Sequence, residues 1–342
     1  MYHWYSQAII CYVYLADVPD VKGDMEANLY FVNSKWFTRG WTLQELLAPW
    51  EVMFLTSNWQ PIATKKELKS LIAQITGIHE EAVLYMRPDS DRYSIAQTMS
   101  WAAKRTTTRI EDRAYCLMGL FNVNMPLLYG EGPKAFIRLQ TAIINQSDDH
   151  TIFAWTDQTG RGVSRGLLAP DPSYFEHSRE FEAFPYEAVS RPYTMTNMGL
   201  QIQLKLSELP NPYGPSQRTM FAAPLNCSHE SRGRLLLLLT CVGDSSGPAI
   251  DQFYRTDLST AQDIPNWRVG SGNLRTIFFK QKEHLELGPP NVIWIRSIPA
   301  RDTGYTLDRV FPSSNLTSES IMEKFLDTRK SEGRFLVLDS WT

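Results

Sequence analysis

The sequence RGWTLQELLAP fills residues 39–49 and stands between two apolar stretches, CYVYL at 11–15 and EVMFLT at 51–56. Their apolar, β-branched and aromatic residues predict two buried strands, and the segment between them predicts a short helix. An order of strand, loop, helix and strand is typical of a parallel α/β layer. Because ligands bind at the carboxyl ends of strands in such layers, we expect a site near residues 39–49.

Within the expected helix, Trp41 and Glu45 are four residues apart and therefore share one face. A glutamate beside apolar walls is a candidate nucleophile, base or stabiliser of a cationic transition state. The alternative is structural: Trp41 and Leu43 belong to the core, and Glu45 pairs with Arg39 or caps a backbone group. The spacing alone favours this alternative, because ion-paired glutamates outnumber catalytic ones.

The residues before CYVYL, MYHWYSQA at 1–8, predict the end of a helix. A strand as apolar as CYVYL normally lies between two neighbouring strands. We therefore expect a further strand upstream of this sequence.

Residues from the second strand to about 155 have a mainly helical pattern. Capping-box spacings predict three helix starts, at Thr64 with Glu67, Ser94 with Gln97 and Thr108 with Glu111. A fourth helix is predicted over GPKAFIRLQTAIINQ, where apolar residues recur at helical spacing.

The pattern changes to strands after IFAW at 152–155. The predicted strands are MGLQIQLKL, TMFAAPL, GRLLLLLTC, LRTIFFK, NVIWIRS, YTLDRVF and RFLVLDS, with a short helix at SESIMEKFL. The polar, glycine-containing stretch at 156–165 resembles a linker. The fold class is therefore α+β, and the predicted units are 1–50, 51–156 and a β-rich domain at 157–342.

Composition excludes several classes of function. The 342 residues include 34 Lys and Arg and 37 Asp and Glu, which gives a net charge of −3. This composition provides no positive electrostatic field that would attract nucleic acid. The four cysteines are far apart and the six histidines are dispersed, so the spacing predicts neither a metal site nor a bound cofactor. No apolar run approaches the ~20 residues of a membrane span, and the start is a poor signal peptide, which predicts a cytoplasmic location.

Two further motifs have both a functional and a structural interpretation. In KRTTTRIEDRAYCLMG, Arg105 and Arg109 either face a phosphate or an acidic partner, or brace neighbouring carboxylates. In YGEGPKAF, the backbone N–H groups around Gly130 and Gly132 either receive an anion or only turn the chain. The structural interpretation is favoured for both.

A long, ordered set of segments resembles one protein family. These segments are WY-x-x-A-x-x-CYVYLADV, SKWFTRGWTLQELLAP, FLTSNWQPIATKKELKSLIAQITGI, SIAQTMSWAAKRTTTRIEDRAYCLMGLFNVNMPLLYGEGPKAFIRLQ and SDDHTIFAW. Together they resemble fungal heterokaryon-incompatibility (HET) domain proteins, over roughly residues 1–156. HET domains normally begin with a strand and loops upstream of the helix that ends in WY, so residues 1–50 correspond to the last part of a HET domain and 51–156 to a helical associated region. The resemblance therefore predicts an N-terminally truncated member.

The resemblance implies a cytoplasmic role in self/non-self recognition, innate immunity and programmed cell death. The implied partners are other proteins, through self-association or a NOD-like incompatibility partner. The alternative is a non-catalytic protein-interaction module.

HET domains have been compared with Toll/interleukin-receptor-like (TIR) domains, some of which cleave NAD with a glutamate in a W-x-x-x-E helix. The residues Trp41 to Glu45 fit that pattern, so the resemblance implies a partial TIR-like α/β layer with Glu45 as the catalytic carboxylate. It also implies Trp41 and Arg39 as substrate-binding residues and NAD as a substrate. The carboxylate would stabilise oxocarbenium character on the ribose. The nicotinamide pocket of TIR-like folds lies largely upstream of this sequence, so we expect little or no activity from this chain alone.

Overall fold

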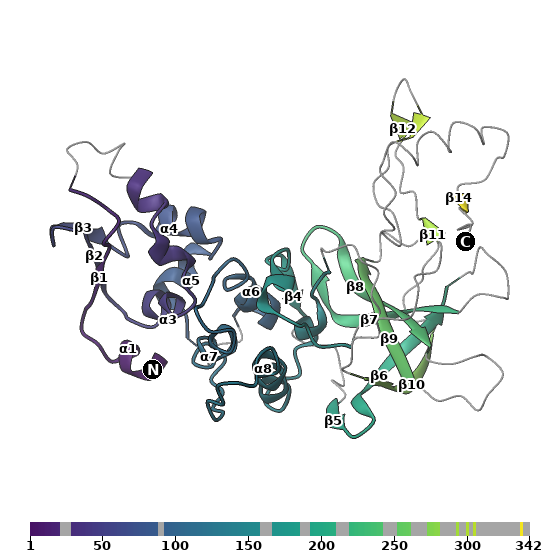
Figure 1. Ribbon diagram of the computed structural model, residues 1–342. Coiled ribbons are helices and arrows are strands. Elements are labelled where there is room, and N and C mark those ends of the chain that lie inside the picture. Colours follow the sequence, from purple (N-terminus) through teal and green to yellow (C-terminus); the bar gives the residue numbers. More distant parts are fainter. Residues whose placement is uncertain are drawn as a thin grey trace, which may run out of the picture.

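The computed structural model describes residues 1–20, 29–87, 92–157, 166–184, 192–209, 219–241, 252–260 and 272–280, together with four two-residue strands after residue 290. Helices and strands both build the fold, which confirms the predicted α+β class. Figure 1 shows an elongated arrangement, with a small sheet at one end, helices in the middle and a larger sheet at the other end.

The N-terminal unit is built around one short helix between two strands. Its elements are α1 (Tyr2–Ser6), β1 (Cys11–Tyr14), η1 (Lys35–Thr38), α3 (Thr42–Leu47), β2 (Val52–Leu55) and β3 (Pro61–Thr64). Strand β1 runs parallel to β2, and β2 runs antiparallel to β3. The parallel β1–β2 pair, connected through α3, confirms the predicted order of strand, helix and strand.

Among the described residues, strand β1 pairs with β2 alone and forms one edge of the sheet. The expected upstream neighbour of this strand stays a prediction. Val13 is buried, whereas Tyr12 and Tyr14 are 63% and 41% exposed. The stretch CYVYL alternates, so its tyrosines lie on one face of the sheet and its smaller residues on the other. The high number of apolar residues in CYVYL predicted a fully buried strand. Because successive side chains of a strand alternate between the two faces of the sheet, the tyrosines are exposed while Val13 is buried.

The middle of the molecule is helical. Its elements are α4 (Lys69–Thr76), α5 (Glu80–Tyr85), α6 (Ile95–Ser100), α7 (Asp112–Tyr115), α8 (Lys134–Ile144), η2 (His150–Phe153) and η3 (Pro172–Phe175). Helix α8 confirms the predicted fourth helix.

The three predicted helix starts have different outcomes. Ser94 and Gln97 form the reciprocal capping box at α6. Thr64 and Glu67 also bind each other's backbone N–H groups, although the regular part of α4 begins only at Lys69. The third prediction is wrong, because α7 begins at Asp112 without a side-chain cap. The Glu111 carboxylate has other partners, described below.

The C-terminal sheet closes into a barrel. Its five strands are β6 (Gly199–Glu208), β7 (Met220–His229), β8 (Gly233–Cys241), β9 (Gln252–Thr260) and β10 (Asn273–Phe279). The order β7-β8-β9-β10-β6 is closed by pairing of β6 with β7, and only β9 and β10 pair in parallel. Two short strands, β4 (Phe181–Ala183) and β5 (Thr194–Thr196), pair antiparallel with β7 and β6, respectively. Closure removes the open edges of the five strands.

Four of the predicted strands are confirmed as β6, β7, β8 and β10. The sequence analysis missed β9, whose stretch QFYRTDLST is interrupted by charged residues. Two other predicted strands, NVIWIRS and RFLVLDS, contain β11 (Val292–Ile293) and β14 (Leu336–Val337), whereas YTLDRVF shares only Tyr305 with β13 (Gly304–Tyr305). The short strand β12 (Pro299–Ala300) was not predicted. The predicted helix at SESIMEKFL lies outside the described residues.

Polar contacts at both ends of η2 connect the helical region to the barrel. The Arg255 guanidinium on β9 lies 3.7 Å from the centre of the Trp155 ring and donates to the Phe153 carbonyl at 2.7 Å and to the Trp155 carbonyl. On the other side of η2, Nδ1 of His150 accepts the backbone N–H of Asn226 at 3.3 Å. The predicted linker lies mostly outside the described residues, and the division at 156 stays a prediction.

We expect His150 to make the fold sensitive to acid. Burial lowers the pKa of His150 from 6.5 to about 4. Between these pH values the unfolded chain binds a proton that the folded chain does not, so acid favours unfolding. We compare the free energy of unfolding of the native chain with that of His150→Gln. As the pH falls from about 6.5 to about 4, this free energy should fall in the native chain by up to about 3 kcal/mol more than in the variant. Urea unfolding of both proteins across this range measures the difference, and a difference that does not vary with pH would contradict the assignment.

Candidate functional site

Glu45 lies on α3 and faces the N-terminal helix α1. It is half-buried, whereas its neighbours Gln44 and Leu46 are buried. The Tyr5 hydroxyl donates to Oε1 of Glu45 at 3.3 Å. Burial and the Glu45 carboxylate together raise the pKa of Tyr5, and the same two causes raise the pKa of the Cys11 thiol. Glu45 is therefore a local negative charge beside Tyr5 of α1.

Arg39 does not join Glu45. The described residues contain no ion pair between the two, and the Arg39 side chain is exposed. The Arg39 backbone is fixed instead, through a bridge to Thr106 and a hydrogen bond to Arg105. Of the three predicted site residues, Trp41 directly precedes α3 and Glu45 lies on it, and Arg39 forms no ion pair with Glu45.

A groove of about 960 Å³ opens beside α3. Trp41, Gln44 and Ala48 line it from α3 and the residues that flank this helix, at positions spaced by three and four residues. Aromatic and polar side chains from other segments complete it, among them Tyr2, His3, Tyr85 and Asn122, together with Trp50 just after the helix. Neither Glu45 nor Arg39 is among the lining residues. The structure thus places Trp41 at the groove and Glu45 outside it.

Gln44 is a groove residue that the sequence analysis missed. Its side chain is buried, and its Nε2 donates to the Cys116 carbonyl, while its Oε1 lies buried without a hydrogen-bond partner. Gly119 packs against it so closely that a Cβ there would lie 2.9 Å from Oε1 and would overlap the side chain of Tyr2. The signal that could have found Gln44 is its place three residues after Trp41 on one helix face.

Arg105 fixes the start of α3. The buried guanidinium donates to the carbonyls of Trp101 at 3.2 Å and Arg39 at 2.9 Å, and to the Thr42 hydroxyl at 3.0 Å. Burial lowers its pKa to about 10. Arg105 therefore has a structural role, but the carboxylate partners expected for it are wrong, because its partners are two carbonyls and a hydroxyl.

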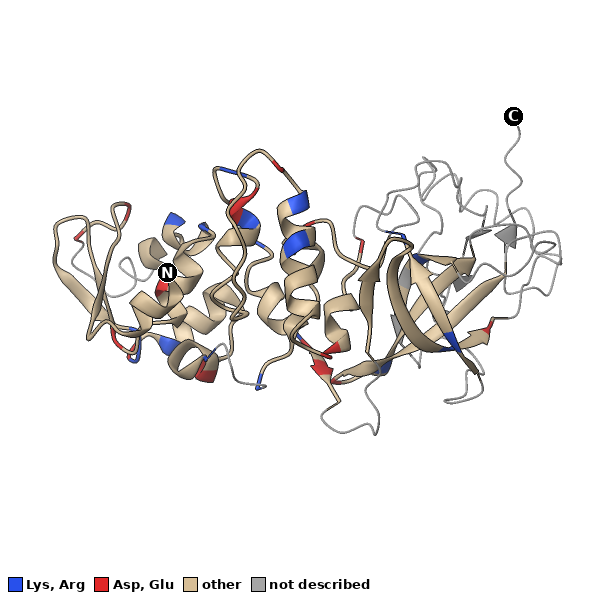
Figure 2. Ribbon diagram, turned by 90° about the horizontal axis from the view of Figure 1, so that it is seen from below, with Lys and Arg blue, Asp and Glu red and all other residues tan. Residues whose placement is uncertain are grey.

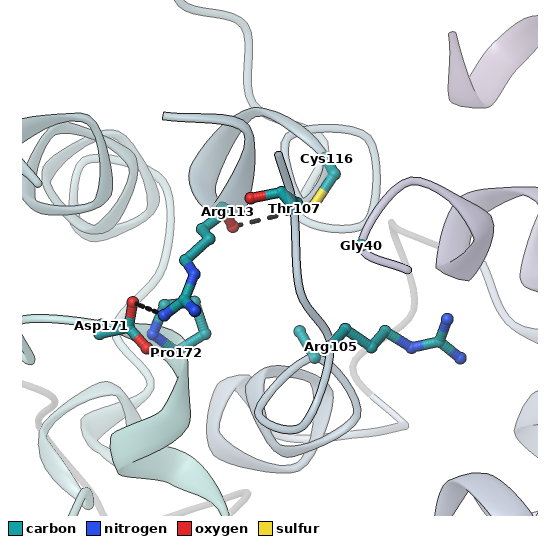
Figure 3. A pocket seen from close by; sticks show the side chains of 8 residues that line it. Gly40, Arg105, Thr107, Arg113, Cys116, Asp171 and Pro172 are labelled. Atoms are coloured by element: carbon teal, nitrogen blue, oxygen red, sulfur yellow. Dashed lines mark hydrogen bonds and ion pairs between the residues drawn. The ribbon is translucent and has the colours of Figure 1, made fainter. Parts of the chain in front are cut away.

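A small cavity lies beside Arg105. Figure 3 shows the Arg105 side chain extending away from the Arg113–Asp171 ion pair at this cavity. The cavity measures about 10 Å³ and accommodates no more than a water molecule. It is therefore no substrate site.

Lys65 fixes the end of the same helix. Its side chain is buried, and the ammonium group donates to the carbonyls of Leu46 at 3.2 Å and Pro49 at 2.5 Å. These carbonyls lie where the negative end of the helix dipole favours a cation. Burial lowers the pKa of Lys65 to about 8.

The glycine loop after α7 already holds an anion from this chain. The Glu111 carboxylate accepts the N–H groups of Gly130 at 2.7 Å and Gly132 at 3.1 Å. Hydrogen bonds from backbone N–H groups, including its own, lower the pKa of Glu111. Both glycines have positive φ, which lets their N–H groups converge. Arg109 lies over the Tyr129 ring at 4.5 Å and so covers the same loop.

The described ranges hold neither a metal-binding cluster nor a membrane-spanning helix. No three or more His, Cys, Asp or Glu side chains gather there in a way that would hold a metal ion. None of the helices in these ranges has both the length and the apolar character of a membrane span.

Comparison with known proteins gives one similarity. Over 148 residues the chain is 47% identical to vegetative incompatibility protein HET-E-1 of Podospora anserina. The chain is similar to part of an incompatibility protein. The matched region covers 42% of this chain but only 11% of that protein. No family model matches the chain, and no solved structure is significantly similar to it.

We expect Lys65 to give stability a dependence on alkaline pH. Its pKa is about 8 in the folded chain and 10.5 ordinarily, so between these values the unfolded chain holds a proton that the folded chain releases. We compare the free energy of unfolding of the native chain with that of Lys65→Met. As the pH rises from about 8 to about 10.5, this free energy should rise in the native chain by up to about 3 kcal/mol more than in the variant. Denaturant unfolding of both proteins measures this difference, and Lys66→Met is the control at an exposed neighbour. A falling or constant difference would show that the Lys65 ammonium is not held as described.

Proposed function

We propose that this chain acts in fungal heterokaryon incompatibility, as a cytoplasmic self/non-self recognition protein and effector of programmed cell death, a form of innate immunity. The observation that carries this proposal is the 47% identity over 148 residues with a vegetative incompatibility protein. The chain spans about a tenth of that relative, so the role of the whole relative is transferred here only as part of the proposal.

The chain acts through association with other proteins, either a second copy or a NOD-like incompatibility partner. Large side chains that remain exposed support this mode of action, including Trp4, Ile9, Tyr12, Trp50 and Trp59. Figure 2 shows charges of both signs interspersed along the described chain, in keeping with the net charge of −3. A nucleic acid partner has no support in such a pattern.

The unit at 1–50 is proposed as the last part of a HET domain with TIR-like ancestry. In an intact homologue, Glu45 is the proposed catalytic carboxylate, with Trp41 and Arg39 as substrate-binding residues. There it stabilises the oxocarbenium character that develops on the ribose when the nicotinamide bond of NAD breaks. No bound cofactor is required.

For this chain alone, the non-catalytic alternative is favoured. Glu45 accepts a hydrogen bond from Tyr5 and lies outside the groove, and Arg39 forms no ion pair with it. The groove and the carboxylate therefore do not form one site in this arrangement. The region at 51–156 is then the helical associated region, and the β-rich region at 157–342 is a domain of unknown function.

Expression of the chain in a filamentous fungus tests the proposal. We expect the native chain to reduce colony growth and viability at least tenfold while the cellular NAD concentration stays unchanged. Glu45→Gln should reduce growth equally, because the carboxylate has no catalytic task here. Glu208→Gln is a control at an exposed carboxylate on the barrel.

Two results would contradict parts of this proposal. Normal growth with stable, folded protein would exclude the role in cell death. A fall in NAD that Glu45→Gln abolishes and Glu208→Gln does not would replace the non-catalytic alternative by the enzymatic one.

A further inference from the structure

The turn between β7 and β8 places a serine beside a histidine. The sequence of residues 229–233 is HESRG. The Ser231 hydroxyl lies 3.3 Å from Nδ1 of His229, and the Ser231 backbone N–H donates to the same nitrogen at 3.2 Å. Because both groups belong to one residue, the backbone contact holds the hydroxyl next to the ring. A serine hydroxyl beside an imidazole nitrogen is the arrangement in which a general base activates a nucleophile.

The second ring nitrogen of His229 faces a carboxylate. Its Nε2 lies 3.3 Å from Oε2 of Glu180, the residue directly before β4. An ionised carboxylate accepts hydrogen bonds and donates none, so it favours the neutral tautomer that carries the proton on Nε2. Nδ1 then keeps the lone pair that can accept the hydroxyl proton of Ser231. Glu180 thus orients the base, as the carboxylate of a serine–histidine–acid triad does.

Strand pairing brings these three side chains together. Strand β4 pairs antiparallel with β7, with Phe181 opposite His229. The Glu230 N–H donates to the Glu180 carbonyl at 3.0 Å. The Phe181 ring packs edge-on against the imidazole, with 5.6 Å between the ring centres. The sheet therefore fixes the base and its carboxylate relative to each other, although they are far apart in the sequence.

The serine is open to solvent, whereas the histidine is largely shielded. Ser231 is exposed, and the His229 side chain is only 15% exposed. A small acyl group can reach the hydroxyl directly. The turn also supplies a cation, because the exposed Arg232 directly follows the serine and forms no ion pair with a described carboxylate. A guanidinium here can stabilise the oxyanion that forms on an attacked carbonyl.

The turn itself does not need the Glu180 side chain. The hairpin is closed by its own backbone, because the Arg232 N–H donates to the His229 carbonyl at 3.3 Å and Gly233 has a positive φ of 74°. The Glu180 carboxylate is 55% exposed, and ion pairs at such positions add little to stability. A nucleophilic serine, in contrast, depends on a carboxylate at the far nitrogen of its base. The placement of Glu180 is therefore the observation that favours a reaction.

We propose that Ser231 and His229, positioned by Glu180, hydrolyse small carboxylic esters. Oγ of Ser231 attacks the ester carbonyl carbon, and the hydroxyl proton passes to Nδ1 of His229. The bond between this carbon and the alcohol oxygen breaks, and the alcohol leaves with the proton from Nδ1. A water molecule then attacks the acyl-serine, its proton passes through Nδ1 to Oγ, and the carboxylic acid is released.

A fluorophosphonate probe on the full chain tests the nucleophile. We expect the probe to bond covalently to Oγ of Ser231, as peptide mass spectrometry detects, and the chain to hydrolyse p-nitrophenyl acetate. Ser231→Ala should abolish the labelling and the hydrolysis. His229→Gln should slow both by at least about a hundredfold, because no base then takes the hydroxyl proton. Ser228→Ala is the matched control at a serine of β7.

The carboxylate has a test of its own. Glu180→Gln should lower kcat for p-nitrophenyl acetate by at least about tenfold and leave KM unchanged, because an amide that donates to Nε2 supports the wrong tautomer. Glu230→Gln, at the neighbouring exposed carboxylate, is the matched control and should change neither constant. If Glu180 only stabilised the turn, its substitution would lower the melting temperature and leave kcat unchanged.

Each other outcome overturns the proposal. A chain whose Ser231 stays unlabelled, or that hydrolyses the ester no faster than Ser231→Ala, has no nucleophile in this turn. Labelling that His229→Gln leaves unchanged would exclude the base, and circular dichroism confirms that each variant keeps its fold. The inference goes beyond the function proposed above, because it gives the barrel an activity that uses neither Glu45 nor NAD. Its test measures neither growth nor NAD, so the two proposals fail separately.

Discussion

Helix α3 keeps its place because buried cations bind backbone carbonyls at both of its ends. A helix of six residues is too short to be stable alone, so its position depends on tertiary contacts. Arg105 holds the Arg39 carbonyl before the helix, and Lys65 holds the Leu46 and Pro49 carbonyls at its end. The helix in turn connects the parallel strands β1 and β2. Neither cation has a carboxylate partner among the described ion pairs, so each depends on carbonyl oxygens in place of an opposite charge.

Local patterns predicted local structure well. The box of Ser94 and Gln97, helix α8 and four barrel strands depend on neighbouring residues, and the structure confirms them. The box at Thr108 failed because Glu111 binds the amides of Gly130 and Gly132, a contact across about twenty residues. Strand β9 was missed because its Arg255 binds carbonyls outside the barrel, which makes a charged residue compatible with a buried strand.

The candidate site shows the limit of reasoning from spacing. A separation of four residues correctly places Trp41 and Glu45 near one another on α3. It carries no information on α1, whose Tyr5 donates to Glu45, nor on the distant segments that complete the groove beside Trp41. The spacing of two residues describes a single helix, whereas a functional site is formed by several segments of the chain. The resemblance to incompatibility proteins therefore rests on the ordered segments as a whole and not on the W-x-x-x-E pattern.

Barrel closure also sets an order of events during synthesis. Because β6 pairs with β10, the ring cannot close until the ribosome has released residues up to Phe279. Arg255 reaches Phe153 and Trp155 only once β9 has emerged, about a hundred residues later than those partners. While the barrel strands are still being synthesised, the helical region therefore lacks its contacts with Arg255. Until β9 emerges, the carbonyls of Phe153 and Trp155 lack their Arg255 partner.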